Sequence, residues 1–65
     1  MTIEQIVADC DEHNLHFSAA RVPGQGEERT WACRIGTDLR NMRLKPTYAE
    51  AVYSAWLAYT GAEVA

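Results

Sequence analysis

The sequence lacks the long apolar run that a membrane-spanning helix requires. Its most apolar stretch, residues 51–59, is interrupted by Ser54 and is far shorter than the roughly 20 residues that cross a bilayer. The first residues contain neither a basic segment nor an apolar run of signal-peptide length, so we expect no cleaved signal. These absences predict a soluble, cytoplasmic protein.

Cysteines and cationic side chains are also few. Cys10 and Cys33 form at most one bridge, which excludes a disulfide-framework protein, and we expect both to be reduced. Six Lys and Arg residues stand against nine Asp and Glu, for a net charge of −3. The pI of about 5.1 is far below the basic balance of a nucleic-acid-binding domain. Direct binding of nucleic acid is therefore not expected.

A chain of 65 residues is one small domain. Hydrophobic residues make up 48% of it, but ten of them are alanines, so the core must be thin. Such a chain hardly encloses a deep pocket as a monomer. Ser18 and Ser54 have no nucleophile-elbow context, and the two histidines lack a recognisable catalytic partner. These features favour a binding or inhibitory protein without a cofactor over an enzyme.

Helix signals begin and end the chain. Thr2 and Gln5 fit a capping box, and Ile3, Ile6, Val7 and Cys10 then form an apolar stripe that predicts a helix over residues 3–13, with Asn14 at its end. A second capping box, Thr47 with Glu50, predicts a helix over residues 48–60 that Gly61 ends. Its core face is expected to hold Tyr48, Val52, Ala55 and Tyr59, with Trp56 beside them.

Alternating patterns between these helices predict three strands. Leu15, Phe17 and Ala19 mark the first strand, the segment 23–26 a hairpin loop, and Trp31, Cys33 and Ile35 the second strand. After a turn at residues 36–38, a third strand is expected over 39–45. Its alternation is irregular, and a bulge or late start near Asn41 accounts for this.

The order α-β-β-β-α predicts an α+β fold, a three-stranded antiparallel sheet covered on one face by two helices. The predicted core is Ile6, Val7, Phe17, Trp31, Ile35, Val52 and Trp56. The opposite sheet face is expected to carry His16, Ser18, Thr30, Arg34 and Arg43, with Lys45 also projecting from it.

Charge is segregated along the chain. Residues 1–12 hold Glu4, Asp9, Asp11 and Glu12 with no Lys or Arg, a block of −4, whereas residues 29–45 sum to +4. Three of these acids fall in the last turns of the predicted helix, where the helix dipole disfavours a carboxylate by roughly 0.3–1 kcal/mol each. The row is therefore either a solvated face or a functional acidic surface that resembles backbone phosphates, together with the loop acids Glu27 and Glu28.

Two further patterns allow a site. Cys10, His13, His16 and Cys33 are residue types that bind zinc, but the two cysteines fall on apolar faces, which favours ordinary buried thiols and no metal. Tyr53 and Leu57 lie far round the second helix from Tyr48, and they are interpreted either as scattered surface residues or as a small contact patch.

Two resemblances bear on function. The segment Thr30-Trp31-Ala32-Cys33-Arg34-Ile35-Gly36, followed by Pro46-Thr47-Tyr48-Ala49-Glu50-Ala51-Val52, resembles the end of small phage proteins with an alpha-beta-alpha sandwich domain. In size, acidity and lack of catalytic residues the whole chain resembles small phage-encoded anti-CRISPR proteins, with a type I-C complex as a candidate target. That resemblance implies an inhibitor in the host bacterial cytoplasm that binds a DNA-binding subunit of a CRISPR surveillance complex, in some members through acidic side chains that imitate DNA.

Other functions remain open on the sequence. The order α-β-β-β-α is also that of double-stranded RNA-binding domains, but where those carry a lysine cluster this chain reads Thr47-Tyr48-Ala49-Glu50. A small phage structural or assembly protein is a third alternative, which an oligomeric solution mass would favour over the expected monomer. The predicted partner-binding residues are the acids Glu4, Asp9, Asp11, Glu12, Glu27 and Glu28, with Tyr53 and Leu57 as the competing patch.

Overall fold

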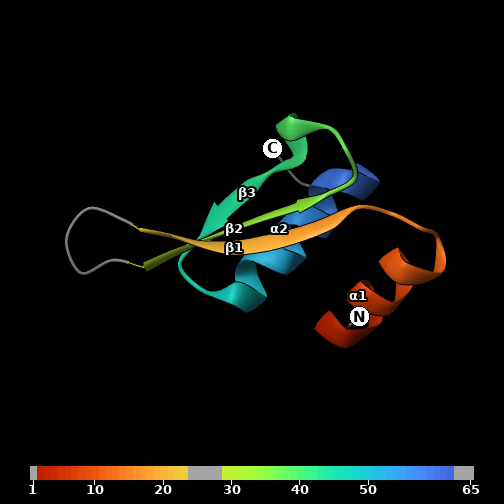
Figure 1. Cartoon of the computed structure of the whole chain (residues 1–65), viewed down its shortest axis with the longest axis horizontal. Helices are drawn as coiled ribbons and strands as arrows, with labels where there is room; N and C mark the ends of the chain where they lie inside the picture. The colour runs from red at the N-terminus through yellow and green to blue at the C-terminus, as the bar shows by residue number, and fades with distance from the viewer. Residues whose placement is uncertain (1, 24–28, 63–65) are drawn as a thin grey trace.

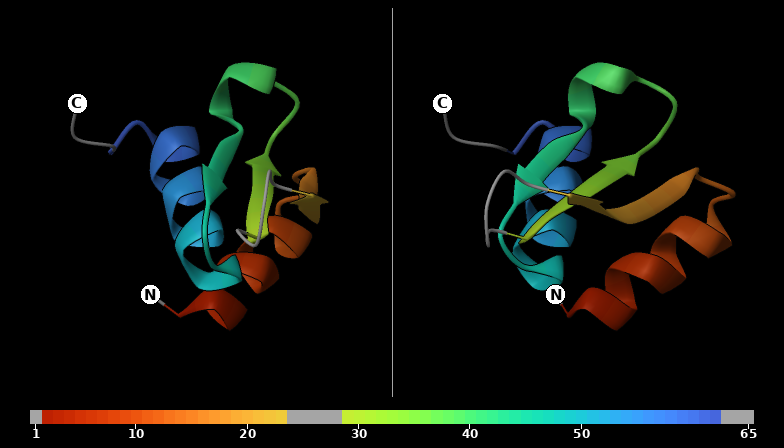
Figure 2. Two further views of the ribbon diagram at one scale, coloured as in Figure 1. Left: turned by 90° about the vertical axis from the view of Figure 1, so that its left-hand side faces the viewer. Right: turned by 60° about the vertical axis from the view of Figure 1, so that its left-hand side comes forward.

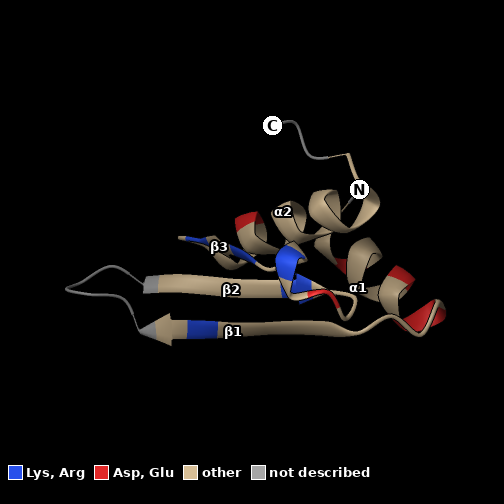
Figure 3. Cartoon of the chain, turned by 90° about the horizontal axis from the view of Figure 1, so that it is seen from above, with Lys and Arg blue, Asp and Glu red and all other residues tan. Residues whose placement is uncertain are grey.

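The computed structural model describes residues 2–23 and 29–62. Its elements follow one another as α1 (Ile3–Glu12), β1 (Phe17–Pro23), β2 (Arg29–Ile35), the 3-10 turn η1 (Leu39–Asn41), β3 (Arg43–Lys45) and α2 (Tyr48–Thr60) (Figure 1). The strands form an antiparallel sheet in the order β1-β2-β3, and both helices lie on the same side of it (Figure 3). The predicted α+β fold is confirmed. Among the described residues, every helix is too short or too polar to traverse a bilayer.

The ends of α1 follow from local signals. The Thr2 hydroxyl accepts the Gln5 backbone N–H at 3.2 Å, and the Gln5 side chain accepts the Thr2 N–H at 2.7 Å, so the predicted capping box is formed. At the other end Asn14 has a φ of 55°. The Leu15 N–H bonds the Cys10 carbonyl at 2.7 Å, and the Asn14 N–H bonds the Asp11 carbonyl, which is the Schellman pattern of a helix end.

The strand register sorts the sheet residues into two faces. Phe17 pairs with Ile35, and Ala19 pairs with Cys33, on the face that the helices cover. The open face carries side chains of all three strands: Ser18, Ala20, Val22, Thr30, Ala32, Arg34 and Leu44. Ser18, Thr30 and Arg34 lie there as predicted. The other side chains on this face, Ala20, Val22, Ala32 and Leu44, are apolar.

The third strand differs from its prediction. It begins only at Arg43, because Asp38 accepts the Arg40 N–H at 2.9 Å and caps the short turn η1 instead of extending the chain. The expected late start is thus present, but the register opposes Arg43 to the buried Cys33 and Leu44 to Ala32. Arg43, predicted for the open face, and Lys45, opposite Trp31, therefore share the helix-side face, and Leu44 is 55% exposed.

Helix α2 is the main cover of the sheet. It begins where predicted, with the Thr47 hydroxyl accepting the Glu50 N–H at 3.2 Å, and it ends before Gly61, whose φ is 78°. It runs along β2 and β3, and α1 packs against it on the same side of the sheet (Figure 2). The Tyr59 ring of its last turn lies against Gly36, which follows β2 with a φ of 85°.

The core joins both helices to the central strand. Seven hydrophobic residues of the described part of the chain are buried: Ile6, Cys10, Cys33, Ile35, Ala51, Val52 and Ala55. Phe17, Trp31 and Trp56 pack against this cluster and are half-buried. Two predictions were wrong: Val7 is 36% and Tyr59 37% exposed. Val7 lies outside the core because it faces an open groove on the flank of α1.

The two cysteines belong to this core. Both are free and buried, as predicted. Burial raises the pKa of the Cys33 thiol to about 11, with a smaller contribution from the neighbouring Cys10. Burial and the charge of Asp9 also raise the pKa of Cys10. Neither is a reactive thiolate, because the thiol form of each is favoured at neutral pH.

Candidate functional site

The candidate site is the exposed acidic side of α1. Glu4, Asp11 and Glu12 are exposed, and Asp9 is half-buried. Glu4 lies in the first turn, where the helix dipole stabilises a carboxylate, and the other three lie in the last two turns. Figure 3 shows acidic residues on α1, whereas the Lys and Arg residues lie on other elements. The structure thus brings four of the six predicted acids onto one element.

The remaining predicted acids, Glu27 and Glu28, lie outside the described residues. Their part in the site therefore stays a prediction from the sequence. The acidic surface discussed below consists of Glu4, Asp9, Asp11 and Glu12.

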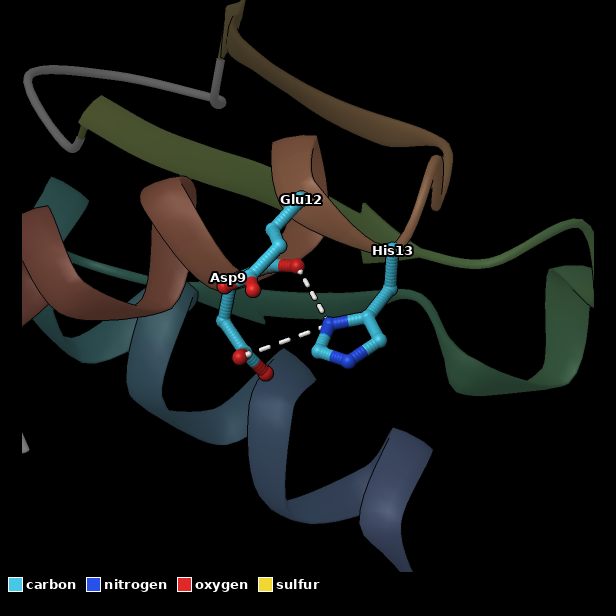
Figure 4. A group of neighbouring side chains, drawn as sticks. All are labelled: Asp9, Glu12 and His13. Carbon is cyan, nitrogen blue, oxygen red and sulfur yellow. Dashed lines mark hydrogen bonds and ion pairs between the residues drawn. The ribbon is translucent and has the colours of Figure 1, made fainter.

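His13 is a member of this site that sequence analysis missed. Its Nδ1 lies 2.9 Å from the Asp9 carbonyl oxygen and 3.4 Å from the Asp9 carboxylate (Figure 4). The hydrogen bond to that carbonyl, followed by the charges of Asp9 and Glu12, raises the pKa of His13 above its usual value. A protonated His13 offsets part of the unfavourable placement of the acids at this helix end. The Asp-x-x-x-His spacing was the available signal, because it puts both side chains on one helix face.

Potential metal ligands in the described residues gather in one place. Ligand atoms of Asp9, Glu12 and His13 lie within 4.8 Å of one another (Figure 4). All three come from one surface turn, and His13 Nδ1 is engaged by the Asp9 backbone. The zinc set considered from the sequence is not assembled, because Cys10 and Cys33 are buried in the core and His16 Nε2 accepts from Arg34 at 3.0 Å.

An open groove of about 880 Å³ runs along the flank of α1. Its lining combines the apolar stripe of α1 with residues from the start of β1 and of α2: Ile3, Glu4, Val7, Ala8, Cys10, Asp11, Leu15, Phe17 and Tyr48. Tyr48 is held at this position by an edge-to-face contact with Trp31, with ring centroids 5.1 Å apart. The groove is mainly apolar, and its ionisable groups are the acids Glu4 and Asp11, the Cys10 thiol and the Tyr48 phenol.

The competing patch on α2, Tyr53 and Leu57, is exposed but lies apart from the acidic surface of α1. Tyr53 is 39% and Leu57 42% exposed, one turn apart on the side of α2 away from the buried Val52 and Ala55. Their predicted exposure is confirmed. Neither residue lines the groove beside α1.

Three arginines, Arg34, Arg40 and Arg43, have partners within the fold. Arg40 forms a two-pronged ion pair with Asp38, with Nη2 to Oδ2 at 2.9 Å, and this pair lowers the pKa of Asp38. Arg43 donates to the Arg40 carbonyl at 2.7 Å and to the Met42 carbonyl at 2.9 Å. Arg34 donates to His16 across the open sheet face. Arg34, Arg40 and Arg43 are thus engaged in contacts within the fold.

Three comparisons, with protein-family models, with curated proteins and with solved structures, found no match for the chain.

Proposed function

We propose that this chain is a non-enzymatic inhibitor that uses the acidic surface of α1 to bind a basic, DNA-binding surface of another protein. The observation that carries the proposal is the charge density of α1. Its ten residues span about 15 Å at 1.5 Å per residue. Four carboxylates over that length average one charge per about 4 Å, similar to the 3.4 Å per phosphate along one strand of B-DNA, and three of the four gather in the last turns of the helix.

The surroundings of α1 support this proposal. Neither Lys nor Arg occurs in α1, and Arg40 pairs with Asp38 rather than with an acid of α1. Within α1 and its cap the one opposing group is His13, which carries charge only when protonated. A concentrated negative field on one end of a small molecule accelerates association with a basic surface.

The target class comes from the anti-CRISPR resemblance of the sequence. A subunit of a CRISPR surveillance complex that holds target DNA in a basic channel has the surface that the α1 carboxylates match in charge. In this proposal the protein acts in the host bacterial cytoplasm as a monomer, and it competes with target DNA for that channel.

The test measures binding to a purified DNA-binding subunit of such a complex. Replacing Asp9 and Asp11 by Asn and Glu12 by Gln should preserve the fold, since two of these acids are exposed at a helix end that disfavours them. We expect slower association, a smaller salt dependence and weaker competition with DNA.

A single-charge pair controls for net charge. Asp11→Asn removes one exposed carboxylate from α1, and Glu50→Gln removes one exposed carboxylate from the first turn of α2. Only the first should slow association clearly. Equal effects would show that net charge alone matters, and a triple variant that inhibits like the parent while Tyr53→Ala or Leu57→Ala abolishes binding would move the contact to α2.

A second candidate is a nucleic-acid-binding module. The observation in its favour is the order α-β-β-β-α with both helices on one sheet face, the order of double-stranded RNA-binding domains. Against it, Glu50 stands in the first turn of α2, where those domains carry lysines. We expect no shift of duplex RNA or DNA at micromolar protein and physiological salt, because a net charge of −3 opposes counterion release. Clear salt-sensitive binding of either duplex would favour this second candidate.

A further inference from the structure

We propose that the groove beside α1 accepts a cationic segment of the protein partner with one bulky apolar side chain, flanked by Lys or Arg. This inference rests on the proposed function and specifies what the partner presents to α1. An acidic face alone attracts any basic surface. The groove adds a place where one apolar side chain is removed from water, and that selects among such surfaces.

The flank of α1 supplies the apolar surface of the groove. Val7 stands on the apolar stripe of the helix and is nevertheless 36% exposed, because it faces the groove instead of the core. Ile3, Leu15 and Phe17 line the same groove and are half-buried, so each retains surface that an apolar side chain can cover. A volume of about 880 Å³ is ample for one large side chain with its neighbours.

The acidic residues that line the groove indicate a cationic occupant. Glu4 and Asp11 both line the groove and lie seven residues apart on α1, which places them about 10 Å apart along the helix axis. Both are exposed, and among residues 2–23 and 29–62 no cationic side chain lines the groove with them. An apolar trough with a carboxylate near each end is complementary to an apolar anchor that has a cation on each side.

The groove is also preformed. Its aromatic end, Tyr48, is fixed by the Trp31 ring, and its α1 side is fixed by the buried Ile6 and Cys10. The turn that joins α1 to β1 is held by the Leu15 N–H bond to the Cys10 carbonyl. A preformed groove saves the occupant the cost of ordering it, so a short segment is a sufficient ligand.

The test uses a synthetic peptide, Lys-Lys-Ala-Trp-Ala-Lys-Lys, and the full chain with ¹³C-labelled methyl groups. We expect the peptide to shift the methyl signals of Ile3, Val7 and Leu15 and to leave those of Val22 and Leu44 unchanged. Exchanging the peptide's Trp for Ala, or its lysines for Glu, should abolish the shifts. Shifts confined to Leu57 or Leu44, or equal binding of the Trp-free peptide, would overturn the proposal.

A matched pair of variants separates the groove from the acidic face. Val7→Gln inserts a polar side chain into the groove without changing charge, and Leu44→Gln does the same on the open sheet face, where the residue is 55% exposed. The first should weaken peptide binding by about fivefold or more, and the second should leave it unchanged. Thermal melts of both variants should confirm that they remain folded.

The two proposals fail in different ways. If Val7→Gln binds both the peptide and the protein partner like the parent, while neutralising Asp9, Asp11 and Glu12 still weakens the partner, the groove is not used and the acidic-surface function stands. If neutralisation has no effect on the partner and Val7→Gln still weakens the peptide, the groove binds such segments but the proposed function is wrong.

Discussion

The two helices of this protein contribute different things: α2 supplies core residues, and α1 supplies charge. Helix α2 contributes Ala51, Val52 and Ala55 to the core and carries one acid, Glu50. Helix α1 is shorter, contributes only Ile6 and Cys10, and carries four acids. The molecule therefore separates packing from charge: the helix that covers the sheet is nearly neutral, and the charged helix lies at the sheet's edge with one flank open. A small domain can expose dense charge where few core contacts depend on it.

The sharpest test of this contrast compares two valines. Val52→Ala on α2 removes two buried methyl groups and should cost about 2 kcal/mol of unfolding free energy. Val7→Ala on α1, at a site 36% exposed, should cost less than about 0.5 kcal/mol. Urea denaturation of both variants measures the difference in unfolding free energy. The change in helix propensity is the same in both, because each variant replaces a helical Val by Ala. Equal losses would mean that the two helices are equally important to the core.

A second test addresses how α2 is held at its far end. An alanine Cβ at Gly36 would lie 3.1 Å from the Tyr59 ring, whereas one at Gly61 would meet nothing within 4 Å, and both glycines have positive φ. Gly36→Ala should therefore cost about 1.5 kcal/mol and Gly61→Ala about 1 kcal/mol. In a Tyr59→Ala background the excess at Gly36 should disappear. An excess that persists there would assign it to the backbone alone.

The helix caps give a smaller, local contrast. Thr47→Ala should lower global stability by about 1 kcal/mol, because the sheet cannot remain covered without α2. Thr2→Ala removes an equivalent bond, yet it should mainly speed amide hydrogen exchange within α1 and change the global unfolding midpoint less. Native-state hydrogen exchange followed by NMR distinguishes these results. Equal changes in the global midpoint would contradict the looser attachment of α1.

The smallest effect concerns pH. The folded-state pKa of His13 is raised above its usual value of about 6.5, so the protonated form is stabilised by folding. This contribution is fully present below about pH 6.5 and is lost as pH rises through the folded pKa. The parent should therefore lose a little stability on going from pH 6 to pH 8 that His13→Gln does not lose, as urea midpoints at each pH would show. Identical pH profiles in the parent and in His13→Gln would show that protonation of His13 does not stabilise the end of α1.

The same titration affects the proposed function. Protonated His13 reduces the charge of the α1 surface from −4 to −3, so association with a basic partner should slow as the pH falls. In His13→Gln this slowing should be weaker. A partner whose association rate is independent of pH in both proteins would show that the His13 charge does not reach the contact.

Local sequence signals determined most of the secondary structure. Local signals predicted both helices and the first two strands. These signals are the capping residues Thr2 and Thr47, the positive-φ residues Asn14 and Gly61, and the 3.6-residue and two-residue periodicities. Strand β1 nevertheless begins at Phe17, two residues after the predicted Leu15, and includes Pro23, which was predicted to lie in the hairpin loop. These signals work because a cap or a turn involves atoms only a few residues apart. The charge of α1 was likewise readable, because it is a property of composition and helix position.

Only the tertiary structure decided which side each element presents. The register of β3 against β2 turned Arg43 inward and Leu44 outward, and the packing of α1 left Val7 exposed along an open groove. A one-residue change of register reverses the faces of a strand, and a small shift of a helix uncovers a flank, yet neither alters the local pattern of apolar residues. The sequence by itself therefore determined the elements and their charge, whereas packing between distant segments determined the groove that the acids border.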